Sequence, residues 1–179
     1  MRDVFIVEAV RTPIGRGRDD GALHAVHPVD LLALTLEECV KRAGVKKSDV
    51  QDVIAGCVTP MGKQGANVAR LALLKAGFPI EVPGVQLNRM CGSGQQAVHF
   101  ASQAISAGDM NLAIGGGVEM MGTVPMGSDW GVLDEEFHTG TPNIVLVVTA
   151  TGGDVDDPAV AAAAEDLSSD LAAETSGGK

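Results

Sequence analysis

The 179-residue chain contains no tyrosine and a single tryptophan, and aromatic residues make up only 3% of it. The composition therefore offers no aromatic platform for stacking nucleic-acid bases. Aliphatic residues, alanine and glycine must supply the hydrophobic core, and so many small side chains favour close packing of one backbone against another. The length suits one domain with a core of its own.

Cysteine is also scarce, since Cys39, Cys57 and Cys91 are widely spaced and include no Cys-x-x-Cys pair. This pattern argues against a disulfide framework and against a zinc site. Glu8 and Arg11 interrupt the first apolar run, unlike a secretory signal, and no run approaches the roughly 20 apolar residues that span a bilayer. We expect a soluble cytoplasmic protein with no metal and no membrane partner.

Basic residues are nearly missing from the carboxyl end, and this produces the net charge of −10. After residue 130 the chain holds ten acidic residues and one basic residue, whereas the first 130 residues hold 12 basic and 13 acidic ones. A near-neutral body has no basic stripe, so we expect no nucleic-acid partner.

Strand-like and helix-like patterns alternate along the first 118 residues. The apolar positions of 28–43 recur every three or four residues, with Pro28 suited to the first turn and Gly44 to the stop. Asn67 is a suitable N-cap for the next helix. The predicted elements are strand 4–10, helix 28–43, strand 50–58, helix 68–76, strand 82–90, helix 91–107 and strand 112–118. This alternation predicts an α/β sheet with parallel crossovers.

The helix predicted for 91–107 has no charged face, because no Asp, Glu, Lys or Arg lies between Arg89 and Asp109. Such a helix is usually covered on all sides. The other predicted elements can cover only one side of it. We therefore expect this helix to need a partner that residues 1–130 do not supply.

Large apolar side chains become rare after residue 130, where Asp, Ala and Ser dominate. We divide the chain into a domain of residues 1–130 and a divergent acidic tail of residues 131–179, which we expect to be largely disordered. The apolar run at 143–150 has two interpretations, an edge strand or an aggregation-prone segment. The alanine-rich stretch 158–173 is compatible with a weak helix.

Cys91 stands between the strand predicted for 82–90 and the uncharged helix. A thiol at a helix N-terminus faces unpaired backbone N–H groups and the positive end of the helix dipole, which favour a thiolate. Gly92 and Gly94 let other groups approach the sulfur, and the amide of Cys91 or Gly92 is suited to donate to a developing oxyanion. The residues alone leave two interpretations open: a catalytic nucleophile, or an inert cysteine of the common buried kind.

Three other candidates fit structural roles better. His99 follows Cys91 by eight residues, roughly 12 Å along a helix, which is too far to pair with the sulfur. His27 suits a helix start. Cys57 ends a strand pattern and suits buried packing.

Two further motifs carry little chemistry of their own. The glycines at 15 and 17 lack the third glycine of a dinucleotide fingerprint, since position 20 is Asp. Glu119 follows the glycine-rich strand at 112–118. We consider two roles for it: an acceptor of hydrogen bonds from loops near Cys91, or a purely structural residue.

Several blocks of the sequence, in order, resemble the amino-terminal half of a thiolase, the family that includes acetyl-CoA acetyltransferases and 3-ketoacyl-CoA thiolases. The resemblance covers about residues 1–130 and is carried by VFIVEAVRTPIGR, by VQLNRMCGSGQQAVHFASQAISAGDMNLAIGGGVEMM and by VPMGSDW. It implies a thiolase-like half with a mainly parallel sheet, helices on both faces and a buried helix after the nucleophile strand. It also implies that Cys91 is the nucleophile that carries the acyl group.

The resemblance further implies acyl-CoA and CoA as substrates, with no cofactor beyond these thioesters. The reaction is thiolytic cleavage or condensation of a 3-ketoacyl-CoA through an acyl-cysteine, and the protein is expected to be a homo-oligomer. In the family a histidine and a second cysteine from the other half complete the site, and the sequence contains neither motif. We therefore expect a truncated chain with impaired turnover. The alternatives are a non-catalytic interaction fragment, which associates with itself or with a full-length relative, and a product that aggregates.

Overall fold

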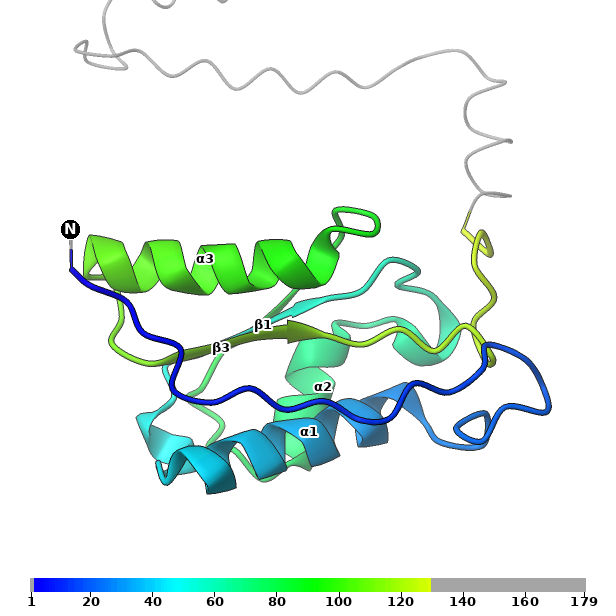
Figure 1. The fold of residues 1–179 in the computed structure, drawn as a ribbon, viewed down its shortest axis with the longest axis horizontal. Coiled ribbons are helices and arrows are strands. Elements are labelled where there is room, and N and C mark those ends of the chain that lie inside the picture. Colours follow the sequence, from blue (N-terminus) through cyan, green and yellow to red (C-terminus); the bar gives the residue numbers. More distant parts are fainter. Residues whose placement is uncertain (1, 130–179) are drawn as a thin grey trace, which may run out of the picture. The chain divides into compact units, whose positions relative to one another are not determined.

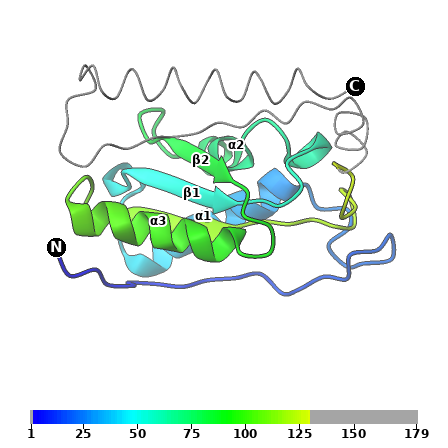
Figure 2. The same ribbon diagram turned by 90° about the horizontal axis from the view of Figure 1, so that it is seen from above.

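The structure is a computed structural model that describes residues 2–129. Its sheet has three parallel strands in the order β2-β1-β3. Helices α1 and α2 cover one face of the sheet and α3 covers the other (Figures 1 and 2). The elements are α1 (Pro28–Ala43), β1 (Asp52–Gly56), α2 (Val68–Lys75), β2 (Gly84–Leu87), α3 (Ser93–Ala107) and β3 (Ala113–Gly117), with short 3₁₀ turns at Lys47–Asp49 and Gly62–Gln64. The predicted α/β fold, with a parallel sheet and helices on both faces, is confirmed.

The helices begin and end at the predicted signals. His27 caps α1, since its Nδ1 accepts a hydrogen bond from the Val29 amide at 3.3 Å, and Gly44 ends α1 in the left-handed conformation with φ 69°. Asn67 caps α2 by accepting from the Arg70 amide at 3.1 Å. The bounds of α1 agree with the prediction, and α2 ends one residue early.

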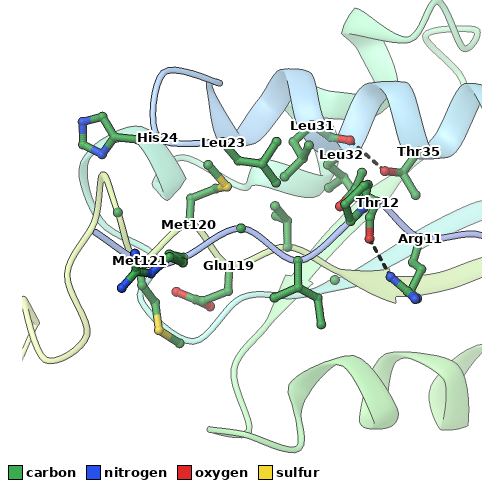
Figure 3. A pocket seen from close by; sticks show the side chains of 18 of the residues that line it. Arg11, Thr12, Leu23, His24, Leu31, Leu32, Thr35, Glu119, Met120 and Met121 are labelled. Carbon is green, nitrogen blue, oxygen red and sulfur yellow. Dashed lines mark hydrogen bonds between the residues drawn. The ribbon is translucent and has the colours of Figure 1, made fainter. Parts of the chain in front are cut away.

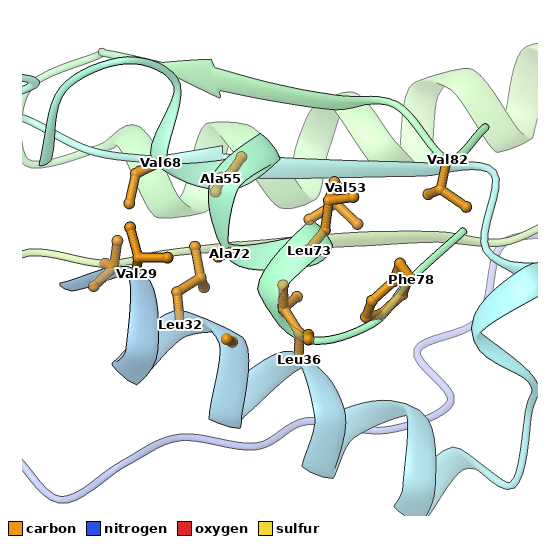
Figure 4. Close-up of a cluster of buried hydrophobic side chains, with 14 of the residues drawn as sticks. Val29, Leu32, Leu36, Val53, Ala55, Val68, Ala72, Leu73, Phe78 and Val82 are labelled. Atoms are coloured by element: carbon orange, nitrogen blue, oxygen red, sulfur yellow. The ribbon is translucent and has the colours of Figure 1, made fainter. Parts of the chain in front are cut away.

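The main core lies between the sheet and the pair α1 and α2 (Figure 4). It is built mainly from aliphatic side chains, with one phenylalanine, Cys57 and Met120. Its members include Val29, Leu32, Leu36, Val53, Ala55, Val68, Ala72, Leu73, Phe78 and Val82. Alternation along β1 directs Val53 and Ala55 to this core and leaves Ile54 for the opposite face.

A smaller cluster holds α3 against the sheet, where Ile54 packs with Ala97 and Ala101. Gly115 makes this close approach possible, because a Cβ there would lie 2.7 Å from the Cα of Val98. On the rest of α3, Val98 and Phe100 are 39% and 46% exposed. Within the described residues α3 is therefore covered on one side only, as its uncharged surface led us to expect.

The prediction of a strand at residues 4–10 is wrong. This segment passes along the β3 side of the sheet without joining it, and Phe5, Ile6 and Val7 are 79%, 81% and 66% exposed (Figures 1 and 2). Arg2 anchors its start, with the backbone amide on the Ser106 carbonyl at 3.2 Å. A β-branched run becomes a strand only when a neighbouring strand forms hydrogen bonds with its backbone N–H and C=O groups. No strand in residues 2–129 pairs with residues 4–10.

The other three predicted strands are present but shorter at both ends than the apolar runs that predicted them. Backbone pairing stops at Leu87 on β2 and at Gly117 on β3, where the chain turns into loops. Three predictions concern residues outside those described: an edge strand or an aggregation-prone segment at 143–150, a weak helix at 158–173, and disorder over most of 131–179. No helix among those described has both the length and the apolar character required to cross a bilayer.

Candidate active site

Cys91 lies on the loop between β2 and α3, directly before Gly92, the N-cap residue of the helix. The thiol is exposed. The helix begins at Ser93, two residues later than predicted, and no side chain of the described residues caps its N-terminus. Backbone N–H groups of the first helical turn and the positive end of the helix dipole therefore lie next to the sulfur-bearing residue. The predicted placement of Cys91 is confirmed.

Hydrogen bonds within residues 88–93 hold the loop in one shape. The Asn88 carboxamide oxygen accepts from the Met90 amide at 2.9 Å. The Ser93 hydroxyl accepts from the Arg89 amide at 2.8 Å and donates to the Met90 carbonyl at 2.6 Å. These bonds keep Met90 in the left-handed region, at φ 48°, which a residue with a side chain seldom adopts. The unusual backbone immediately before Cys91 is thus fixed from both sides.

Gly92 completes the turn. Its N–H donates to the Arg89 carbonyl at 3.1 Å, and its carbonyl accepts the first helical bond from Gln96. The Gly92 amide is therefore already occupied in this structure. The Cys91 amide makes no hydrogen bond to any residue of 2–129, which leaves it as the better candidate for an oxyanion donor.

Gly56, at the end of β1, brings the N-terminus of α3 close to the sheet. A Cβ at this position would overlap the backbone of Ser93 and lie 2.6 Å from the Gly94 nitrogen. Only glycine permits this approach. The carboxyl end of β1 therefore fixes how closely the loop that carries Cys91 approaches the sheet.

Glu119, on the loop after β3, forms hydrogen bonds with another loop at the same end of the sheet. Its carboxylate accepts from the Val58 amide at 2.6 Å, the Thr59 amide at 3.3 Å and the Gln64 carboxamide at 2.9 Å. Gln64 is fully buried, and its own oxygen accepts from the Met120 amide at 2.5 Å. These bonds fit both roles considered from the sequence, since Glu119 accepts hydrogen bonds from the loop that follows β1 and thereby holds that loop in place.

Cys57 differs from Cys91 in its burial and in its position in the fold. It is buried at the end of β1, and its amide donates to the Leu87 carbonyl at 3.0 Å. Burial, assisted by the nearby charge of Glu119, raises the pKa of the Cys57 thiol to about 12. Cys57 is therefore a packing residue and not a second nucleophile, as the sequence indicated.

A cavity of about 410 Å³ lies between residues 10–17, helix α1 and residues 117–122 (Figure 3). Its walls include Leu23, Leu31 and Leu32, with Glu119 and Met120 from the loop after β3. Cys91 does not line this cavity, and we assign it no part in the chemistry of the thiol.

The histidines lie away from the thiol. His27 caps α1, His24 lines the cavity, and His99 lies inside α3, eight residues beyond Cys91. None of these three hydrogen-bonds to Cys91, and His138 lies outside the described residues. Within residues 2–129 no group of three or more His, Cys, Asp or Glu side chains is arranged to hold a metal ion.

Sequence reasoning did not assign roles to Asn88, Ser93 or Gln64. Asn88 and Ser93 flank Cys91 within the motif, and short polar side chains beside a turn are a recognisable sign of local backbone bonds. Gln64 gives no such sign, because two of the three partners of its side chain, Glu119 and Met120, lie 55 or more residues away in sequence, and only the Thr59 carbonyl is local.

Comparison with known proteins extends over most of the chain. The family described as thiolase, N-terminal domain, matches residues 4–172, past residue 130, where the resemblance was expected to end. The steroid 3-ketoacyl-CoA thiolase FadA6 of Mycobacterium tuberculosis is 44% identical over 142 residues, which are 79% of this chain and 34% of that protein. The β-ketoadipyl-CoA thiolase of Pseudomonas aeruginosa is 51% identical over 125 residues, 69% of this chain and 31% of that protein. The chain spans about a third of the length of these curated relatives.

A solved structure agrees with these relatives. The acetyl-CoA acetyltransferase of Bacillus anthracis superposes with a TM-score of 0.55 at 43% sequence identity, covering 57% of this chain and 26% of that one. The matched family, the relatives and the shared fold lead to one conclusion: the chain belongs to the thiolase family.

Proposed function

We propose that this chain carries the acyl-accepting cysteine of a thiolase-type acyltransferase, with Cys91 as the nucleophile. The observation that supports this most is the exposed Cys91 thiol in a tightly bonded turn at the uncapped N-terminus of α3. Family membership and relatives named as 3-ketoacyl-CoA and β-ketoadipyl-CoA thiolases support it further. The substrates are acyl-CoA and CoA, the reaction needs no other cofactor, and the compartment is the cytoplasm.

In the proposed cleavage reaction the Cys91 thiolate attacks the 3-keto carbonyl of a 3-ketoacyl-CoA. The bond between C2 and C3 breaks, C2 takes up a proton, acetyl-CoA leaves, and the shortened acyl group stays on the sulfur as a thioester. The thiol of a second CoA then attacks that thioester and frees Cys91. A covalent intermediate of this kind divides one difficult step into two easier ones. Condensation of two acyl-CoA molecules is the same sequence in reverse.

The chain contributes two features to this chemistry. The dipole of α3 and the N–H groups of its first turn place partial positive charge beside Cys91. The Cys91 amide is available to donate to the oxyanion that forms during attack. Neither feature removes a proton from the thiol or supplies one to C2.

The reaction also needs a base to remove the proton from the thiol, and no histidine among the described residues hydrogen-bonds to Cys91. Loss of a general base typically slows such a step by about 10²–10⁴-fold. We therefore propose that the chain by itself takes up an acyl group slowly and completes negligible turnover.

Intact mass measurement after incubation with acetyl-CoA tests the proposal. The wild-type chain is expected to gain one acetyl group, and Cys91→Ser is expected to gain none. Thiolysis of acetoacetyl-CoA by the chain alone is expected to be negligible. Equal acetylation of the Cys91→Ser variant would contradict the role of Cys91, and rapid thiolysis would contradict the proposal that the chain by itself completes negligible turnover.

A second function is favoured by the exposed apolar residues. Val98 and Phe100 on α3, and Phe5, Ile6 and Val7 before α1, lie open to solvent. Exposed apolar residues of this kind suit association, so the chain is also a candidate interaction fragment that pairs with itself or with a full-length relative. Size-exclusion chromatography with light scattering tests self-association. A monomer at all concentrations would contradict it.

A further inference from the structure

We infer that Glu119 is a positioning residue for Cys91, acting through Val58 and Asn88 on the backbone of Met90. The inference rests on the proposed acyl transfer, because it assigns Glu119 and Asn88 a task only if Cys91 is the acyl acceptor. Glu119 lies 28 positions beyond Cys91 in the sequence, on the loop after a different strand.

The first link joins Glu119 to the loop after β1. One carboxylate oxygen of Glu119 accepts from the Val58 amide at 2.6 Å, the shortest of its three bonds. The other oxygen accepts from both the Thr59 amide and the Gln64 carboxamide. All three donors are neutral, and no ion pair among residues 2–129 involves Glu119. The carboxylate therefore acts as an acceptor for three N–H groups, a task that needs acceptor capacity on both oxygens.

The second link joins the same loop to the nucleophile turn. The Val58 carbonyl accepts from the Asn88 Nδ2 at 2.8 Å. The other end of that carboxamide, Oδ1, accepts from the Met90 amide at 2.9 Å. Asn88 is thus bonded at both ends, and Val58 is bonded through both its N–H and its carbonyl.

The third link reaches Cys91 through the backbone. Met90 holds φ 48°, and the peptide that follows it carries the Cys91 amide. A left-handed residue that is not glycine persists only where its surroundings enforce it. Since Met90 determines the direction in which the chain enters Cys91, a loosened Met90 changes the positions of both the sulfur and the candidate oxyanion donor.

Two near-isosteric substitutions interrupt the relay at different links. Glu119→Gln replaces one acceptor oxygen by an NH₂ group, so that either the Val58 amide or the Thr59 and Gln64 donors face another donor. Asn88→Asp keeps the acceptor for the Met90 amide but sets an oxygen against the Val58 carbonyl. Glu81→Gln is the matched control, since Glu81 is an exposed carboxylate without a hydrogen bond or ion pair in residues 2–129.

The test measures three quantities on the full chain: the rate of Cys91 acetylation by acetyl-CoA, the hydrogen exchange of the Met90 amide, and alkylation of each cysteine by iodoacetamide. In Glu119→Gln and Asn88→Asp we expect acetylation to slow by about 10-fold or more, because misplacement of a reacting group by about 1 Å costs up to about 10²-fold. The Met90 amide is expected to exchange at least about 10-fold faster, the factor that corresponds to loss of one modest hydrogen bond. Alkylation of Cys91 is expected to change less than about 3-fold, since this small reagent needs only an accessible thiolate. Glu81→Gln is expected to match the wild type.

The double variant Glu119→Gln/Asn88→Asp is expected to be no slower in acetylation than the slower single variant, because both changes break one relay. Cys57 reports unfolding, since it becomes reactive only when its burial is lost. Unchanged Met90 exchange in Glu119→Gln would overturn the inference, as would acetylation that falls only in proportion to new Cys57 labelling. If wild-type Cys91 takes no acetyl group at all, the proposed function fails and the claim that the relay serves acyl transfer fails with it. Met90 exchange still decides separately whether Glu119 orders the loop.

Discussion

At the scale of single residues, the local environments of two thiols differ in the way that the sequence indicated. Cys57 is buried at the end of a strand beside Glu119, and Cys91 is exposed at a helix N-terminus. Cys57 lies inside the strand predicted for 50–58, whereas Cys91 directly follows the strand predicted for 82–90. The bonds of Asn88 and Ser93 to the backbone of residues 89–90, which distinguish the Cys91 turn, are visible only once the chain is folded.

Cysteine reactivity should follow these environments. Since the pKa of Cys57 is raised to about 12, its thiolate fraction at pH 8 is about 10⁻⁴, and burial blocks access to the sulfur as well. We expect iodoacetamide at pH 8 to label Cys91 at least about 100-fold faster than Cys57, as measured by peptide mass spectrometry. Labelling of both at similar rates while the chain remains folded would contradict the structure.

Asp52, at the start of β1, carries a carboxylate oxygen that is buried without a hydrogen-bond partner in the described residues. Desolvation by burial raises the pKa of this carboxyl, so the folded chain holds the proton more tightly than the unfolded chain does. The charged form therefore destabilises the fold at neutral pH. The penalty disappears below the ordinary aspartate pKa of about 4, where the carboxyl is protonated in both states.

We expect Asp52→Asn to raise the free energy of unfolding at pH 7 by up to about 1 kcal/mol, and to have little effect at pH 3.5. Urea unfolding at the two pH values measures this. Asp109→Asn, at an exposed position, serves as the control and should change neither value. A loss of stability in Asp52→Asn at pH 7 would show that the carboxylate has a stabilising partner.

At the scale of helices and strands, local signals predicted the elements well where the chain carries its own stop and start chemistry. His27, Gly44 and Asn67 each end or begin a helix through bonds that involve only nearby residues. The strand predicted at residues 4–10 failed because strand formation depends on a neighbour that no local signal reveals. The same dependence explains why the other strands are shorter than their apolar runs.

Gly56 connects strand packing to the candidate site. Gly56→Ala places a methyl group against the backbone of Ser93 and Gly94, and we expect it to lower stability by about 1–3 kcal/mol and to slow acetylation of Cys91. The matched control is Gly116→Ala on the neighbouring strand, where a Cβ meets no atom within 4 Å. Thermal unfolding and acetylation rates measured on both variants provide the check. Equal effects of the two substitutions would show that loss of glycine flexibility, and not contact with α3, is responsible.

At the scale of the whole molecule, the described residues leave an unusual amount of apolar surface uncovered. The charge-free stretch of the sequence predicted this for α3, since a helix without a polar face needs cover on all sides. Nothing in the sequence predicted it for Phe5, Ile6 and Val7, because the β-branched run to which they belong is typical of a buried strand. Motif resemblance located Cys91 in advance, whereas the link from Glu119 to Met90 depends on three loops that meet only in the folded chain.

Exposed apolar residues near the N-terminus should promote association without stabilising the fold. We expect the double substitution Phe5→Ser/Ile6→Ser to leave the unfolding free energy within about 0.5 kcal/mol of wild type and to reduce self-association, as measured by light scattering over a range of concentrations. Leu34→Ser, which replaces a 61% exposed residue on α1, is the control for general surface polarity. Lower stability with unchanged association would indicate that the segment packs against the fold.

Transfer of an acetyl group from acetyl-CoA, located by peptide mass spectrometry among the three cysteines, tests the central claim most directly. With Cys91 exposed at the N-terminus of α3, we predict that the acetyl group is found on Cys91 and that Cys39 and Cys57 stay unmodified. Acetylation of Cys39 or Cys57 in the folded chain, or of no cysteine at all, would contradict the assignment of Cys91 as the acyl acceptor.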